Sequence, residues 1–152
     1  LTLIQTVRAN MDPIVMIAGK GSTYWTNWTQ HITTDSVGNN TISPEDESLY
    51  FIADKPKDAV EHILQFYKIY HSSRYVRNDY VIRLNYRISE TGIEKLNESF
   101  FDIIREGKIY QSDPLSCEQD HLHLPRLIVP HTRRSFGRIR QLIDMVNTCE
   151  PA

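Results

Sequence analysis

Two short runs of apolar and aromatic residues, each followed by a segment with helical periodicity, constrain the fold of this chain more than any other feature. Residues 14–18 read IVMIA and residues 49–53 read LYFIA. Runs of this length without polar alternation are typical of strands buried on both faces, as in parallel sheets. The segments at 22–34 and 56–70 carry apolar residues at helical spacing. Two consecutive strand–helix units predict a parallel sheet with right-handed crossovers.

The turn between the first predicted strand and its helix has the sequence GKGS at residues 19–22. Sheets of α/β proteins bind ligands at this position, where a strand ends and the free backbone N–H groups of a helix begin. The turn contains neither a complete GxGxxG fingerprint nor a phosphate-binding loop. We therefore interpret it as a tight turn followed by a helix N-cap, with ligand binding as the alternative.

The pattern changes after residue 70. Residues 80–86 mix apolar and polar side chains, which predicts a half-exposed strand. Ser89 is typical of a helix N-cap and Gly107 of a helix stop, so we expect a helix between them. A short strand at 108–111, a polar loop at 113–125, a strand at 126–129 and a helix at 135–146 complete the prediction. These elements form a small β-α-β-β-α unit that we expect to pack on the first.

The first seven residues, LTLIQTV, are apolar and periodic but follow no capping residue. A helix that begins without a cap leaves backbone N–H groups unsatisfied. The pattern therefore predicts a helix that begins before Leu1, in a preceding part of a longer protein. The alternative is a short N-terminal strand or an unstructured tail.

The composition is that of an ordinary globular protein, with 40% hydrophobic and 24% charged residues in 152. A formal net charge of −2 gives no global field that would attract nucleic acid or an anionic membrane. No apolar run approaches the ~20 residues that a membrane span requires. Two cysteines are too few for the disulfide framework of a small secreted domain. We expect free thiols and a cytoplasmic location, with neither nucleic acid nor membrane as a partner.

Arginines gather at two places in the C-terminal half, and the arginine side chain suits bidentate contacts with phosphate. Arg74 and Arg77 belong to the hydroxyl-bearing segment SSRYVR, and Arg133 and Arg134 directly precede the last predicted helix. Cations at a helix N-terminus are unfavourable unless an anion or a carboxylate lies nearby. These four arginines are therefore candidate anion-binding residues, with exposed salt bridges as the alternative.

Metal binding and nucleophilic catalysis have weaker support. His121 and His123 lie two residues apart, so a strand would place both on one face. A zinc site needs three or four ligands at a defined spacing, and no second half of such a motif is present. We therefore expect a solvated loop and no metal. Cys149 has no adjacent histidine base, and neither it nor Cys117 makes a convincing nucleophile.

Several short motifs, taken in order, resemble the LOG (LONELY GUY) family, whose members were formerly labelled lysine decarboxylases. They are LTLIQT at 1–6, PIVMI at 13–17, GSTYW at 21–25 and ISPED followed by LY at 42–50. Four further segments are similar to the C-terminal extension of the longer bacterial members: FY at 66–67, HSSRYV at 71–76, LPRL at 124–127 and FGRIRQLID at 136–144. The resemblance spans nearly the whole chain.

The resemblance implies an α/β fold in which residues 1–70 form the C-terminal part of a Rossmann-like parallel sheet. Residues 71–152 would form the small β-α-β-β-α extension. Characterised members are phosphoribohydrolases, which release a free base and ribose 5-phosphate from a nucleoside 5′-monophosphate without a cofactor, often as homodimers. The family signature PGGxGTxxE and its upstream catalytic arginine are absent from this sequence, so it offers no catalytic residue.

Two hypotheses follow. In the first, the chain is part of a nucleotide-processing hydrolase, with a nucleoside monophosphate as substrate, and is inactive without a missing N-terminal half. In the second, it is a non-catalytic regulatory or oligomerisation module. Such a module would bind an anionic nucleotide or an acidic partner through its arginine-rich end, which also includes Arg138 and Arg140. The expected partner is a second copy of the chain in a homo-oligomer, or the missing N-terminal half.

Overall fold

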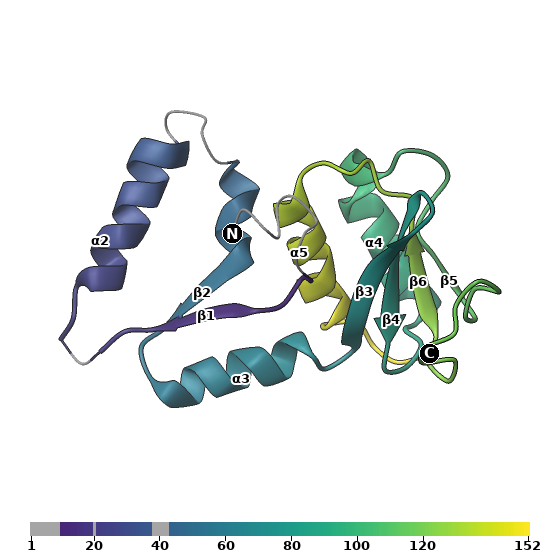
Figure 1. The fold of residues 1–152 in the computed structure, drawn as a ribbon, viewed down its shortest axis with the longest axis horizontal. Helices are drawn as coiled ribbons and strands as arrows, with labels where there is room; N and C mark the ends of the chain where they lie inside the picture. The colour runs from purple at the N-terminus through teal and green to yellow at the C-terminus, as the bar shows by residue number, and fades with distance from the viewer. Residues whose placement is uncertain (1–9, 20, 38–42) are drawn as a thin grey trace.

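The computed structural model describes residues 10–19, 21–37 and 43–152, which form two sheets and the helices around them (Figure 1). In chain order the elements are β1 (Ile14–Ile17), α2 (Tyr24–His31), the π-helical segment η1 (Ile32–Val37), the 3₁₀ helix η2 (Pro44–Leu49), β2 (Tyr50–Ala53), α3 (Pro56–Phe66), β3 (Tyr70–Val76), β4 (Asp79–Leu84), α4 (Glu90–Ser99), the 3₁₀ helix η3 (Phe101–Ile103), β5 (Tyr110–Ser112), β6 (Arg126–Val129) and α5 (Phe136–Val146). The chain is thus a mixed α/β protein. The apolar, periodic residues 1–7 lie outside the described residues, so the expected N-terminal helix is not addressed.

The first sheet is the parallel pair that the two apolar runs predict. β1 and β2 pair in parallel, with Ile14 opposite Tyr50, and the connection between them passes through α2. The backbone N–H of Ala18 extends the ladder by donating to the carbonyl of Ala53 at 2.9 Å. Helix α3 runs along this pair, as Figure 1 shows. A parallel two-stranded unit with a helical crossover is therefore confirmed.

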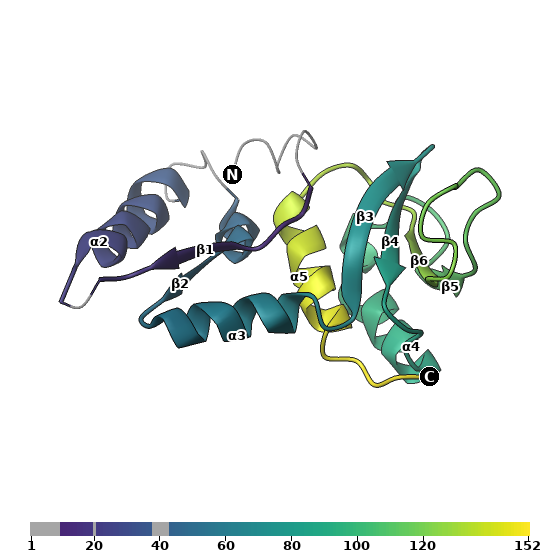
Figure 2. The same cartoon turned by 60° about the horizontal axis from the view of Figure 1, so that its bottom comes forward.

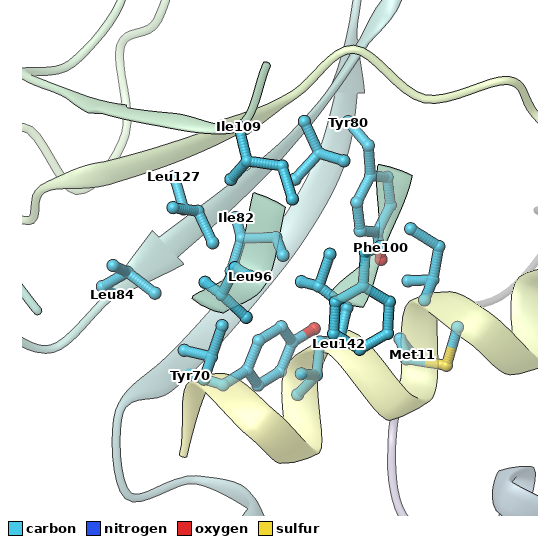
Figure 3. Packing of buried hydrophobic residues seen from close by; sticks show 14 of the residues in the cluster. Met11, Tyr70, Tyr80, Ile82, Leu84, Leu96, Phe100, Ile109, Leu127 and Leu142 are labelled. Carbon is cyan, nitrogen blue, oxygen red and sulfur yellow. The ribbon is translucent and has the colours of Figure 1, made fainter. Parts of the chain in front are cut away.

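The second sheet is antiparallel and has the strand order β3-β4-β6-β5. Helices α4 and α5 pack on one face of it (Figure 2). Alternate residues of β4 point to that face, and Figure 3 shows Tyr80, Ile82 and Leu84 packed with Leu96 of α4 and Leu142 of α5. The intervening β4 residues point to the opposite face, over which the loop at 113–125 folds. The same sheet therefore has an apolar face and a charged face.

The C-terminal unit contains one strand more than the predicted β-α-β-β-α order. The segment at 70–76 is strand β3, and α3 ends at Phe66 instead of continuing to residue 70. The tertiary reason is Asn147, whose Oδ1 accepts hydrogen bonds from the backbone N–H groups of Ile69, at 2.7 Å, and Tyr70, at 2.9 Å. These bonds satisfy the backbone in an extended path. The prediction that β4 is half-exposed was also wrong, because five of its six residues are buried.

One hydrophobic core joins the segments before and after residue 70. Leu49, Phe66 and Ile69 belong to the same buried cluster as residues of β4, β6 and α5. Helix η2 packs closely against α5, because a Cβ atom at Gly137 would collide with the backbone of Glu45 and Asp46. The boundary expected at 70/71 thus lies within a continuous core.

No helix in the described part of the chain is long and apolar enough to cross a membrane.

Candidate functional site

The buried carboxylate of Glu118 gathers three arginines on the charged face of the antiparallel sheet. Arg126 Nε donates to Glu118 Oε2 at 2.7 Å, and neither side chain has exposed surface. Arg74 Nη2 lies 3.1 Å from Oε1, and Arg83 Nη2 lies 3.5 Å from the same oxygen. Three guanidinium groups therefore share one carboxylate, which leaves positive charge in excess.

The strand register brings these arginines together. Arg83 of β4 lies directly opposite Arg126 of β6, and Ser72 of β3 lies opposite Arg83. Like charges in directly opposed positions repel each other. Glu118 enters from the loop at 113–125 and lies between them, with the backbone N–H of Leu115 donating to Oε2 at 3.2 Å. The loop is thus held over the sheet by its one buried carboxylate.

The cluster keeps Glu118 ionised. Burial by itself would raise the pKa of Glu118. The hydrogen bond from Arg126, the N–H of Leu115 and the charges of Arg126 and Arg74 outweigh burial and lower that pKa below its ordinary value. Because Glu118 remains charged at neutral pH, it offsets one of the three guanidinium charges.

A polar cavity of about 270 Å³ adjoins this cluster. It lies between the beginning of β1, the end of α3 and the strands β3 and β4. Its lining is Asn10, Asp12, Tyr67, Tyr70, His71, Ser72, Ser73, Arg74, Arg83 and Asp120. Two of the arginines that Glu118 gathers therefore also line the cavity.

These two arginines do not use all of their hydrogen-bond donors. Within the described residues, Nε of Arg74 and Nε of Arg83 are buried without a hydrogen-bond partner. Arg83 is only 8% exposed, and its Nη1 makes a long contact of 3.3 Å with Ser72 Oγ. Buried polar groups are almost always hydrogen-bonded, so an unpartnered guanidinium N–H beside a cavity requires an explanation.

Neutral hydroxyl groups and two carboxylates complete the lining. Ser73 Oγ lies 2.9 Å from the hydroxyl of Tyr70 and 2.6 Å from that of Tyr80. Burial raises the pKa of Tyr70 far above its ordinary value, so its hydroxyl keeps its proton. Asp12 accepts a hydrogen bond from the Tyr67 hydroxyl at 3.1 Å, and Asp120 is an exposed residue of the lining. The cavity thus combines cationic, hydroxyl and anionic groups.

The four arginines singled out from the sequence do not form one site. Arg74 belongs to the cluster around Glu118. Arg77 and Arg133 meet at the β3–β4 turn, where Arg133 Nη2 donates to the carbonyl of Arg77 at 2.7 Å. The guanidinium of Arg133 also lies over the ring of Tyr75, 4.4 Å from its centre. Arg134 is exposed beside the N-terminus of α5.

A carboxylate of the chain itself pairs with a third cation at the N-terminus of α5, while Arg134 stays exposed. Arg138, in the first turn of α5, donates to both oxygens of Asp102 at 2.8 and 2.9 Å. The hydrogen bonds from Arg138 lower the pKa of Asp102. Arg140 is buried, pairs with Asp144 at 3.0 Å and covers the ring of Phe66. Arg138 and Arg140 therefore serve the fold.

Among the described residues, histidines and cysteines do not assemble into a metal centre. The rings of His71 and His121 lie 4.6 Å apart and those of His121 and His123 lie 6.3 Å apart, but no group of metal-ligating side chains was found among the described residues. Cys117 is exposed and Cys149 is half-buried, and both are free thiols.

Sequence reasoning missed Arg83, Arg126 and Glu118, the centre of the site. A charged residue inside an otherwise apolar strand was the available signal for the two arginines, in VIRL and RLIV. Such a residue is costly to bury unless a partner of opposite charge meets it. Nothing in the acidic loop distinguishes Glu118 from its neighbours, because its importance depends on where the loop folds.

The chain matches no protein-family model, no curated protein and no solved structure.

Proposed function

We propose that this chain is part of a nucleotide-processing protein that hydrolyses the N-glycosidic bond of nucleoside 5′-monophosphates. The products would be a free base and ribose 5-phosphate. The observation that carries the proposal is the parallel β1–α2–β2 unit, with Gly19, Gly21 and Ser22 between β1 and α2. This unit is compatible with the end of a Rossmann-like sheet, which the ordered motifs of the LOG resemblance imply.

The proposed hydrolysis requires catalytic and phosphate-binding groups that the family signature supplies. An oxocarbenium-like ribose needs a nearby carboxylate, and a 5′-phosphate needs backbone N–H groups at a helix N-terminus. The signature that supplies these groups in the family is absent from this sequence. The chain would therefore contribute scaffold and the C-terminal extension to the hydrolase. A cytoplasmic location and a homo-oligomer belong to the same proposal.

An assay of base release tests the hydrolase proposal. The protein that contains this chain is incubated with AMP, GMP, CMP, UMP and IMP, and free base is quantified by chromatography. We expect release from at least one monophosphate and much slower release from the matching nucleoside, because the phosphate anchors the substrate. Absence of release from every monophosphate would exclude the proposal.

A regulatory module that binds an anionic ligand is the second candidate. The excess of arginine around Glu118, next to a cavity, favours it specifically. In this candidate the arginines that matter are Arg74 and Arg83, since Arg133 stacks on Tyr75 within the chain. Replacing both Arg133 and Arg134 by alanine is then expected to leave ligand binding and assembly unchanged.

A further inference from the structure

We propose that the cavity between β3, β4 and the start of β1 binds a small sugar phosphate, with the phosphate on Arg74 and Arg83 and the sugar hydroxyls on Asp12 and Asp120. This inference deepens the second candidate function and does not depend on the hydrolase assignment. It rests on the charge, the unpartnered donors and the carboxylates of the cavity lining.

The arginine end of the cavity has the properties of a phosphate site. Arg74 and Arg83 each retain a buried Nε–H without a partner, and Glu118 neutralises one guanidinium among three. Charge-assisted hydrogen bonds from guanidinium to phosphate are short and strong, and they gain strength where water is excluded. A phosphate in the cavity would offer acceptors to both guanidinium groups.

The Ser72 hydroxyl on β3 extends this end of the cavity. Ser72 lies opposite Arg83 in the sheet register, and its Oγ lies 3.3 Å from Arg83 Nη1. Because its hydroxyl proton rotates, Ser72 can donate to an anion in place of its present neighbour.

The carboxylates decide which kind of anion fits. Asp12 and Asp120 would repel an anion that filled the whole cavity, and ionised carboxylates only accept hydrogen bonds. They therefore favour a ligand that carries hydrogen-bond donors as well as its phosphate, such as the hydroxyls of a sugar. A cavity of about 270 Å³ is slightly below the ~300–1,000 Å³ that is usual for drug-sized ligands. A single sugar phosphate suits that size better than a dinucleotide.

Calorimetry on the protein that contains this chain tests the inference, with glucose 6-phosphate as the probe. Inorganic phosphate and glucose, the two halves of the probe, are titrated separately. We expect saturable binding of glucose 6-phosphate, at least tenfold weaker binding of inorganic phosphate and no measurable binding of glucose. Equal affinity for phosphate and glucose 6-phosphate would overturn the sugar-phosphate assignment.

Matched arginine variants locate the binding. Arg74→Gln is expected to weaken the affinity for glucose 6-phosphate about tenfold or more, the effect of losing one charge-assisted contact. Arg87→Gln is the control, because Arg87 follows β4 and pairs with Asp113 but does not line this cavity. Hydrogen–deuterium exchange should show ligand protection in β3 (Tyr70–Val76) of the parent and the control.

Two results would refute the site. The first is no binding of glucose 6-phosphate by the parent protein at millimolar concentration. The second is an affinity of Arg74→Gln equal to that of the parent, with both proteins melting at similar temperatures. Neither result bears on base release from nucleoside monophosphates, so failure here and failure of the hydrolase proposal are distinguishable.

Discussion

Arg83 and Arg126 lie directly opposite each other on β4 and β6, and the carboxylate of Glu118 contacts both. Two opposed arginines on a buried sheet face would repel each other without it. The carboxylate comes from a loop that sequence patterning marks only as polar. The conformation of the loop at 113–125 and the stability of the sheet therefore depend on each other.

Replacing Glu118 by glutamine is expected to lower the free energy of unfolding by about 3–5 kcal/mol, the range for removing one partner of a buried ion pair. The variant leaves three guanidinium groups without a counter-charge. Urea denaturation followed by circular dichroism measures the loss. Asp113→Asn breaks the exposed pair with Arg87 in the same loop and should cost less than about 1 kcal/mol. Equal losses in the two variants would contradict the structural role assigned to Glu118.

His131 is expected to make the fold sensitive to mild acid. It has no exposed surface, and its Nδ1 lies 2.5 Å from the Tyr75 hydroxyl. Burial, aided by the charge of Arg133 and opposed by a backbone contact with Arg134, lowers the pKa of His131 to about 4. The unfolded chain therefore binds this proton more readily than the native state. Stability is retained above pH 6.5 and falls as the pH decreases from 6.5 towards 4.

The stability lost through His131 is about 3 kcal/mol, because each unit of pKa difference between the unfolded and native states corresponds to about 1.4 kcal/mol. The measurement is urea unfolding of the parent and of His131→Gln at pH 7.5, 6.0 and 4.5. Glutamine does not titrate, so the stability difference between the two proteins should shrink or reverse at low pH. A difference that stays constant with pH would show that His131 does not carry this sensitivity.

Asn147→Ala is expected to destabilise the chain by about 3 kcal/mol or more, because it leaves three buried backbone groups without partners. Besides its two bonds to Ile69 and Tyr70, Asn147 donates from Nδ2 to the carbonyl of Phe66 at 2.6 Å. Thermal unfolding measures the effect. Asn85→Ala removes an exposed asparagine that also contacts the segment between α3 and β3, and it should lower the stability much less. An equally large loss of stability in Asn85→Ala would show that the burial of Asn147 does not determine the effect.

Gly137→Ala is expected to destabilise the protein, although alanine in a helix is normally favoured over glycine by up to about 1 kcal/mol. The added Cβ would collide with the Glu45 carbonyl and lie 2.7 Å from the Asp46 nitrogen, and these backbone atoms have little room to move. Gly19→Ala is the control, since its Cβ would meet only Ser22 at an ordinary 3.8 Å. A gain in melting temperature for Gly137→Ala would mean that η2 does not pack on α5 as described.

Most helices and strands could be predicted from local pattern. The apolar runs identify β1 and β2, and Ser89 caps α4 as expected, its Oγ accepting from the N–H of Gly92 at 3.3 Å. Strand β3 escaped prediction because HSSRYV is polar and follows directly on a helical pattern. Its backbone becomes extended through pairing with β4 and through Asn147, which is 77 residues away from Tyr70.

The candidate site was likewise predictable only in part from local sequence. Arg74 was identified from the local segment SSRYVR, because arginine side chains beside hydroxyl groups suit an anion. Its partnership with Arg83 and Glu118 could not be predicted, because it requires β3, β4 and a distant loop to meet. By itself the sequence determined the local elements, whose periodicity and caps act over a few residues. Only the tertiary structure decided which buried charges face one another, because that depends on strand order and register between residues far apart in the chain.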